Sequence, residues 1–193
     1  LMKDKFSVLK EYFGHDSYRA GQEQIVDSLL SGKDVLCIMP TGAGKSVCYQ
    51  VPALIFDGVT IVVSPLISLM KDQVGSLVQS GVAAAYINSS LSPNQYAKVL
   101  KNTVAGKYKI IYVAPERLAT PEFLDVCEKV NISLIAVDEA HCVSQWGQDF
   151  RPSYLKITEF ISSLSRRPIV GAFTATATDE VKADIARILQ LHN

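Results

Sequence analysis

The chain has 193 residues, of which 48% are hydrophobic and 20% are charged, and its 19 basic side chains balance its 19 acidic ones. This length suits one domain with its own hydrophobic core, and the chain has no run of about 18 apolar residues that would span a membrane. A net charge of zero excludes a strongly basic surface over the whole domain and disfavours tight binding of nucleic acid through charge alone.

Short apolar segments alternate along the chain with longer segments of helical periodicity. Two helices are expected first, at 4–13 and 20–31. Strands are expected at 34–39, 59–64, 83–87, 109–114, 132–137 and 168–173. Further helices are expected at 44–56, 66–79, 92–105, 121–129, 153–164 and 178–190. Strands that are apolar throughout, such as 60–63 and 134–137, are typical of parallel strands buried on both faces. The pattern predicts one α/β domain over residues 1–193, with a mostly parallel sheet and helices on both faces.

Polar residues follow nearly every predicted strand at its carboxyl end. The segments are 39–46, 64–66, 115–117, 138–141 and 174–178. Ligands of open α/β sheets bind at the carboxyl ends of the strands. The sequence therefore predicts one ligand-binding edge of the sheet.

Residues 39–46 read Met-Pro-Thr-Gly-Ala-Gly-Lys-Ser and join the strand at 34–39 to the next predicted helix. Glycines in such a turn let backbone N–H groups face an anion, and the helix N-terminus adds partial positive charge. We expect Lys45 to reach the outer phosphates of a nucleotide and the Ser46 hydroxyl to ligate Mg²⁺. Met39 stands where the full Walker pattern has glycine, so a chance glycine turn is the alternative. The residues expected to cradle the phosphates are Thr41, Gly42, Ala43, Gly44, Lys45 and Ser46.

Asp138 and Glu139 directly follow the apolar strand at 132–137. Adjacent carboxylates in this position are typical of nucleoside triphosphatases, in which one holds Mg²⁺ and the other acts on the attacking water. We assign Asp138 to the metal, through a water molecule, and Glu139 to the attacking water. The alternative, an exposed acidic pair on a loop, is disfavoured by the phosphate loop upstream.

Asp138-Glu139-Ala140-His141 resembles the Asp-Glu-x-His box of superfamily-two helicases. Other segments resemble further motifs of that superfamily in the same order: 64–73 motif Ia, 112–118 the next nucleic-acid-facing motif, and 173–178 motif III. Residues 141–152 are similar to the aromatic-rich loop of RecQ-family DNA helicases, and 13–25 resemble the adenine-recognition segment of that family. The resemblance covers nearly the whole chain. It implies the RecA-like P-loop NTPase fold and the first of two motor domains.

The resemblance implies that ATP is the nucleotide and assigns residues to its base. Gln22 would make paired hydrogen bonds to the N6 and N7 edge of adenine, and Arg19 would stack on the base or bridge to its phosphate side. The alternative for Gln22 is an exposed helix residue. His15 stands where many relatives have an aromatic residue that stacks on adenine.

The resemblance also implies nucleic-acid contacts. Trp146, Phe150 and Arg151 would form a planar, cationic surface on which single-stranded bases stack. Lys71 and Arg117 would contact the phosphate backbone. The alternatives are that Trp146 fills core volume and that Lys71 and Arg117 are ordinary surface charges.

His141 is expected to couple the nucleotide site to motif III through a hydrogen bond toward Thr174 or Thr176. The catalytic residues are then Lys45, Asp138, Glu139 and His141. The alternatives are a metal ligand at position 141 and two threonines with only a structural role.

The function implied by the resemblance is that of the ATP-binding motor domain of a 3′-to-5′ DNA helicase in recombination and repair. Its cofactors would be ATP and Mg²⁺. Its partners would be single-stranded or partly duplex DNA and a second RecA-like domain, with no membrane partner. Because the arginine finger of such enzymes lies on the second domain, this chain alone is expected to be nearly inactive and not to unwind DNA. The alternatives are a domain of an RNA helicase of the same superfamily and an inactive nucleotide- or nucleic-acid-binding module.

The four cysteines, Cys37, Cys48, Cys127 and Cys142, are scattered and form no CxxC motif. This spacing predicts neither a zinc site nor a disulfide framework and indicates a reducing, intracellular compartment. The start of the chain lacks the apolar core of a signal peptide. We expect the nucleoid or cytoplasm of a bacterium, or the nucleus of a eukaryote.

Overall fold

The computed structural model describes residues 3–40 and 44–192. Its core is a six-stranded sheet in the order β1-β6-β5-β2-β4-β3. The strands are β1 Val35–Ile38, β2 Val59–Val63, β3 Ala84–Ile87, β4 Ile110–Val113, β5 Ile132–Val137 and β6 Ile169–Thr174. Every neighbouring pair is parallel, so the predicted α/β fold class is confirmed and the sheet is parallel throughout rather than mostly so.

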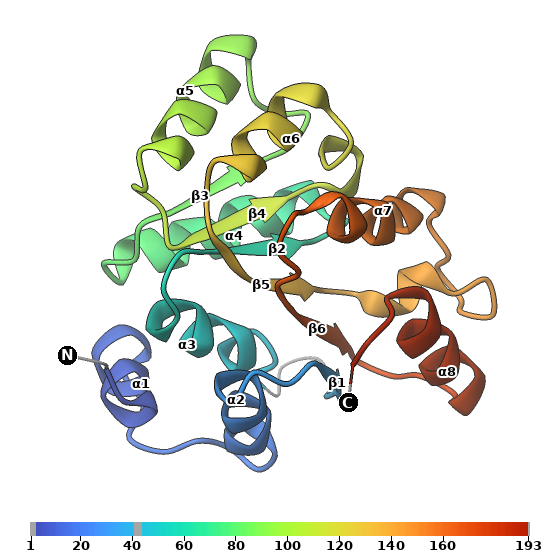
Figure 1. Cartoon of the computed structure of the whole chain (residues 1–193). Helices are drawn as coiled ribbons and strands as arrows, with labels where there is room; N and C mark the ends of the chain where they lie inside the picture. Colours follow the sequence, from blue (N-terminus) through green and yellow to red (C-terminus); the bar gives the residue numbers. More distant parts are fainter. Residues whose placement is uncertain (1–2, 41–43, 193) are drawn as a thin grey trace.

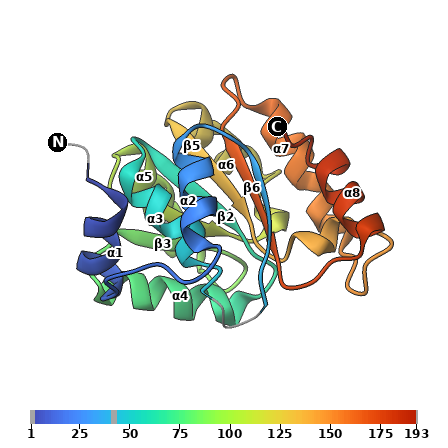
Figure 2. The same cartoon turned by 90° about the horizontal axis from the view of Figure 1, so that it is seen from below.

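Helices cover the sheet on both sides (Figures 1 and 2). They are α1 Lys5–Phe13, α2 Gln22–Leu30, α3 Val47–Ile55, α4 Ile67–Gln79, α5 Pro93–Val104, α6 Pro121–Glu128, α7 Lys156–Ser163 and α8 Asp179–Ile188. Three short 3₁₀ helices are η1 Pro115–Arg117, η2 Ala140–Val143 and η3 Pro152–Leu155. Among the described residues, no helix has the length and apolar character needed to cross a lipid bilayer.

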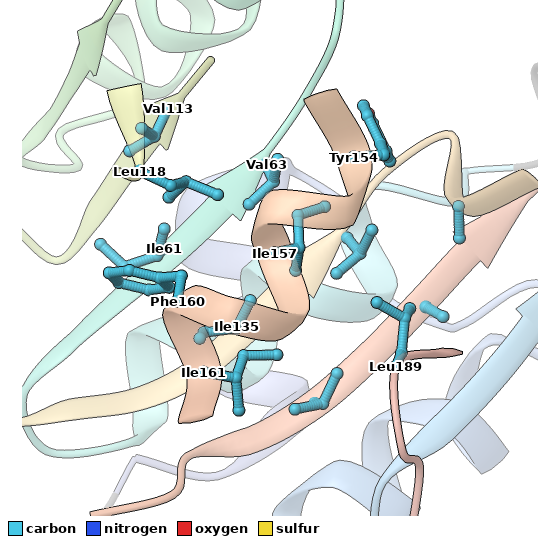
Figure 3. Packing of buried hydrophobic residues seen from close by; sticks show 14 of the residues in the cluster. Ile61, Val63, Val113, Leu118, Ile135, Tyr154, Ile157, Phe160, Ile161 and Leu189 are labelled. Atoms are coloured by element: carbon cyan, nitrogen blue, oxygen red, sulfur yellow. The ribbon is translucent and has the colours of Figure 1, made fainter. Parts of the chain in front are cut away.

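The two faces of the sheet bury separate hydrophobic clusters. On one face α5 to α8 pack on the strands, and Ile157 and Phe160 of α7 belong to the same cluster as Ile61 of β2, with Phe160 beside Ile61 (Figure 3). On the other face α2, α3 and α4 supply residues such as Tyr49 and Met70. Burying each such side chain stabilises the fold by about 1.5–3 kcal/mol. The two-sided burial explains why the strands read as apolar throughout.

Two of the predicted helices begin three residues later than their sequence pattern indicates. The predicted helix at 44–56 begins at Val47, because residues 45–46 form a turn before it. The predicted helix at 153–164 begins at Lys156, because Pro152 opens the 3₁₀ helix η3 first. Proline favours the first turn of a helix, and here that turn is a 3₁₀ turn.

Asp34 ties the amino ends of β1 and β6 to the segment after α8. Its carboxylate pairs with Arg167, 2.7 Å away, and accepts hydrogen bonds from the backbone N–H groups of Val170 (2.9 Å) and His192 (2.6 Å). Burial opposes ionisation of Asp34, but Arg167 and the two N–H groups hold the pKa of this carboxyl below its ordinary value.

The order of the strands positions the predicted ligand-binding edge. β1, β6 and β5 are neighbours, with Ile38 paired to Thr174 and Val137 paired to Ala172. Their carboxyl ends lead into residues 39–40, 174–178 and 138–141, and residues 44–46 follow after the part of the loop outside the described residues. Segments far apart in the sequence are thus brought to one edge of the sheet.

Candidate functional site

Lys45 forms an ion cluster with two carboxylates at the ends of β1 and β5. Its Nζ lies 3.4 Å from Asp138 Oδ1 and 3.6 Å from Glu139 Oε1. The Asp138 side chain is only 6% exposed and that of Lys45 14%. Burial raises the pKa of Asp138, while the charge of Lys45 acts in the opposite direction. The structure brings the three predicted residues together; their catalytic roles stay predictions.

The backbone around Asp138 is held in an unusual conformation. Glu139 has a φ of 51°, in the left-handed region, which costs a non-glycine residue about 1–2 kcal/mol. Its N–H donates to Asp138 Oδ1 (2.9 Å), and the Tyr154 hydroxyl donates to the Asp138 carbonyl (2.8 Å). Tyr154 is fully buried in η3 and no sequence motif pointed to it. The first bond orients the Asp138 carboxylate, and the second holds the backbone that carries both carboxylates.

The oxygen donors at this edge suit Mg²⁺, which prefers carboxylate and hydroxyl ligands. Ser46 stands at the start of α3 and its side chain does not cap the helix. Ser64, at the end of β2, has a buried hydroxyl without a hydrogen-bond partner in the described part of the chain. Ser46 and Asp138 are therefore suitable ligands for the predicted metal.

Gln22 contacts the backbone of Gly44, at the end of the predicted phosphate loop. Its side chain accepts a hydrogen bond from the Arg19 N–H (2.7 Å) and donates one to the Gly44 carbonyl (2.9 Å), and Gln22 is 4% exposed rather than an exposed helix residue. Gly44 has a φ of +78°, and a Cβ at this position would overlap the Gln22 amide. Arg19 and His15 are exposed. The predicted phosphate-binding residues Thr41, Gly42 and Ala43 lie outside the described residues.

His141 links the ion cluster to the end of β6. Its Nδ1 lies 2.7 Å from Thr174 Oγ1 and 3.6 Å from Glu139 Oε2. The Thr174 hydroxyl also donates to the carbonyl of Thr176 (3.3 Å), and the Thr174 carbonyl accepts from the N–H of Met39 (3.0 Å). The structure thus contains the predicted His141–Thr174 bond, whereas Thr176 takes part through its carbonyl and not its side chain.

The loop at 144–151 presents Trp146 to solvent. The indole is 72% exposed, so it does not fill core volume. Phe150 and Arg151 are half-buried, and Arg151 pairs with Asp149 at 3.3 Å. A hollow of about 480 Å³ separates this loop from residues 174–178 and is lined by Trp146, His141 and Val181 among others. An exposed indole beside a hollow can stack a planar ligand.

The two predicted backbone-binding cations differ in their surroundings. Lys71 is exposed on α4. The Arg117 guanidinium in η1 lies 5.0 Å from the centre of the Tyr96 ring, which restricts its motion. Their contact with nucleic acid stays a prediction.

A buried polar network joins α3, which follows the phosphate loop, to β4 and α4. Gln50 donates to the Tyr112 hydroxyl (3.0 Å), which lies 3.1 Å from the Tyr49 hydroxyl and also bonds Gln73. Sequence reasoning missed this network. The signal was the pair Tyr49 and Gln50 inside an otherwise apolar helix.

One group of three potential metal ligands occurs among the described residues. The ligand atoms of His141, Cys142 and Asp149 lie within 4.8 Å of one another. The Arg151 guanidinium already occupies the Asp149 carboxylate, and burial raises the pKa of the Cys142 thiol to about 12. Both effects disfavour a metal there, and the absence of a zinc site stays a prediction.

Comparison with known proteins places these features in a family. The profile of the DEAD/DEAH box helicases matches residues 19–184. The ATP-dependent DNA helicase RecQ of Bacillus subtilis is 49% identical over 187 residues, which are 96% of this chain and 31% of that protein. RecQ of Haemophilus influenzae is 48% identical, over 97% of this chain and 30% of that protein. The chain thus spans about a third of the length of these relatives.

The fold of this chain also resembles that of a solved helicase structure. The crystal structure of the helicase MrfA bound to DNA and AMPPNP superposes with a TM-score of 0.78 at 18% identity, over 98% of this chain and 28% of that one. This similarity shows the RecA-like fold. With the family match and the identity to RecQ, it follows that the chain belongs to the DEAD/DEAH box helicase family and is a RecA-like domain similar to that of the RecQ helicases.

Proposed function

We propose that the chain is the ATP-binding motor domain of an intracellular, ATP-dependent DNA helicase that moves 3′ to 5′ and acts in recombination and repair. One observation carries the proposal. Three neighbouring strands bring Lys45, Asp138 and Glu139 into one ion cluster and connect it, through His141 and Thr174, to a second surface.

The cluster is suited to phosphoryl transfer. The turn before α3 and the N-terminus of that helix would receive the phosphates of ATP, and Lys45 would exchange its carboxylate partners for the outer phosphates. Ser46 and Asp138 would hold Mg²⁺, which supplies neutralisation of phosphate charge when it is bound. Glu139 would orient a water molecule and take its proton as the water attacks the γ-phosphorus and ADP leaves.

Coupling to nucleic acid would run through His141. His141 lies between the Glu139 carboxylate and Thr174, and it bonds to Thr174. Thr174 begins the segment 174–178, which forms one wall of the hollow beside Trp146. Loss of the γ-phosphate would change the position of Glu139 and so the partner that His141 faces. That change would alter the position of a single-stranded base stacked on Trp146.

A second RecA-like domain would complete the site. An arginine from a partner domain typically contributes about 10³–10⁵ in rate to phosphoryl transfer. We therefore expect this chain alone to bind ATP weakly, to hydrolyse it very slowly and not to separate DNA strands.

The nucleotide part is tested by titrating the chain with a fluorescent ATP analogue and Mg²⁺. Lys45→Ala should weaken binding about tenfold or more, since it removes a charge-assisted contact to phosphate. Lys101→Ala on α5 is the matched control and should bind as the wild type does. Equal binding by wild type and Lys45→Ala would contradict the assignment.

The nucleic-acid part is tested with the emission of Trp146, the only tryptophan of the chain. Single-stranded oligothymidylate should quench this emission, because the exposed indole stacks on a base. If only an oligouridylate of the same length does so, the RNA helicase alternative holds. If neither does, and nucleotide also fails to bind, the proposed function and the alternative of an inactive binding module are both contradicted.

A further inference from the structure

The loop at 144–151 is attached to α8 by a partly buried hydrogen bond. The Ser144 hydroxyl donates to Asp184 Oδ2 over 2.8 Å. Ser144 is fully buried and the Asp184 side chain is 14% exposed. In the part of the chain that the structure describes, no other side-chain hydrogen bond joins residues 144–150 to an α-helix or strand. Asp184 lies outside every helicase motif that the sequence resembles.

The same hydroxyl also holds the backbone of Trp146. Ser144 Oγ accepts the N–H of Trp146 (3.2 Å), and the Ser144 carbonyl accepts the N–H of Gly147 (3.1 Å). A Cβ at Gly147 would lie only 3.1 Å from the His141 carbonyl, so the turn is tight. The position of the Ser144 side chain therefore sets the position of a residue whose indole is free in solvent.

Asp184 is itself oriented by its own helix. Arg187, one turn later on α8, lies 2.9 Å from Asp184 Oδ1 and leaves Oδ2 to Ser144. The hydrogen bonds from Arg187 and Ser144 lower the pKa of Asp184, so the carboxylate is charged and is a strong acceptor. A charge-assisted bond of this kind has a fixed direction and resists loosening.

Two bonds consequently attach the segment that carries Trp146 to neighbouring elements of the fold. His141–Thr174 joins the start of the loop region to the end of β6, and Ser144–Asp184 joins the loop to α8. Thr178 caps α8 by accepting the Val181 N–H (3.2 Å), so residues 174–178 lead directly into the helix that carries Asp184.

We propose that Asp184 is a positioning residue for the loop at 144–151: through Ser144 it fixes the backbone of Trp146, so that the indole stands at the hollow ready to stack a base. The proposal rests on the proposed function only in naming nucleic acid as the ligand. Movement of the segment 174–178 would be transmitted to Trp146 by α8 as well as by His141.

The first experiment measures hydrogen–deuterium exchange of the chain without ligand. Asp184→Ala and Ser144→Ala each remove one partner of the Ser144–Asp184 hydrogen bond. Each should speed hydrogen exchange of a peptide covering 144–151 about fivefold or more, which is the lower end of usual coupling strengths. They should also lower the emission anisotropy of Trp146. Asp179→Ala removes an exposed acid from the same helix and is the matched control, with no change expected. Asp184→Asn keeps an acceptor oxygen and should recover part of the protection.

The second experiment measures binding of oligothymidylate and of the ATP analogue by the same variants. Asp184→Ala should weaken the oligonucleotide about fivefold or more and leave nucleotide affinity unchanged. Unchanged exchange in both Asp184→Ala and Ser144→Ala, or an equal effect of Asp179→Ala, overturns the proposal. If Asp184→Ala does not fold, Ser144→Ala and Asp184→Asn decide the matter. If the wild type binds no oligonucleotide, the nucleic-acid part of the proposed function is wrong. The exchange experiment still tests whether Asp184 positions the loop at 144–151.

Discussion

Gly44→Ala isolates the contact between Gln22 and the phosphate loop. Gly44 has a φ of +78°, and an added Cβ would overlap the Gln22 amide that donates to the Gly44 carbonyl. The substitution therefore imposes two separate costs. One is the left-handed conformation of a non-glycine residue, and the other is displacement of a buried amide.

The magnitude follows from these two parts. The conformation costs about 1–2 kcal/mol. Losing a hydrogen bond from a side chain that is 4% exposed costs about 1–3 kcal/mol. The free energy of unfolding should fall by roughly 3 kcal/mol, which lowers Tm by about 6–12 °C for a chain of this size.

Urea unfolding of a four-membered mutant cycle provides the assay. With Gln22→Ala already present, Gly44→Ala should cost only the conformational part, about 1–2 kcal/mol. Gly106→Ala is the matched control, because Gly106 has a φ of +75° with nothing near its missing Cβ. It should cost the conformational part alone, with or without Gln22. The reasoning is refuted if Gly44→Ala costs no more than Gly106→Ala, or if its cost is the same in both backgrounds.

Three further predictions concern the carboxylates. The fold raises the pKa of Asp138 above its ordinary 3.8, so the wild type should lose stability as the pH rises from 3.8 through the raised pKa. Asp138→Asn should remove this loss. Over that pH range, urea unfolding should show the free energy of unfolding of Asp138→Asn increasing relative to that of the wild type. Glu139→Gln, introduced into a longer enzyme that includes a second motor domain, should lower ATP turnover about 10²–10⁴-fold with little change in ATP affinity, and unchanged turnover would revive the inactive-module alternative. Asp34→Ala should lower the free energy of unfolding by about 3 kcal/mol, because it removes the carboxylate that pairs with Arg167 and accepts two backbone N–H groups; a loss below about 0.5 kcal/mol in thermal unfolding would contradict this account.

The sheet and its functional edge were predictable from local pattern. Strands such as 60–63 are apolar on both faces, and burial on two sides of a parallel sheet is what such strands need. Once the strands were placed, the carboxyl-end rule put Lys45 and Asp138 on one edge without any knowledge of strand order. The resemblance to the helicase motifs added the expectation of the His141–Thr174 bond.

Apart from the network around Tyr49 and Gln50, the remaining features depend on the tertiary structure and leave no local pattern. The Gln22–Gly44 bond joins residues 22 positions apart, and the Ser144–Asp184 bond joins residues 40 apart. Serine, aspartate and glutamine are ordinary on helices and turns, so nothing in their neighbourhoods marks them. Tyr154 reads as a helical residue, yet η3 turns its hydroxyl to the Asp138 carbonyl.

The contacts of Asp34 determine where mechanical load enters the domain. The segment after α8 is bound at the amino ends of β1 and β6, the opposite end of these strands from the ion cluster. A pull on this segment would act on the Asp34 carboxylate, which accepts the His192 N–H, as well as on α8. Such a pull would act at the ends of β1 and β6 that lie farthest from Lys45, whereas a ligand would act at the opposite, ligand-binding edge of the same strands.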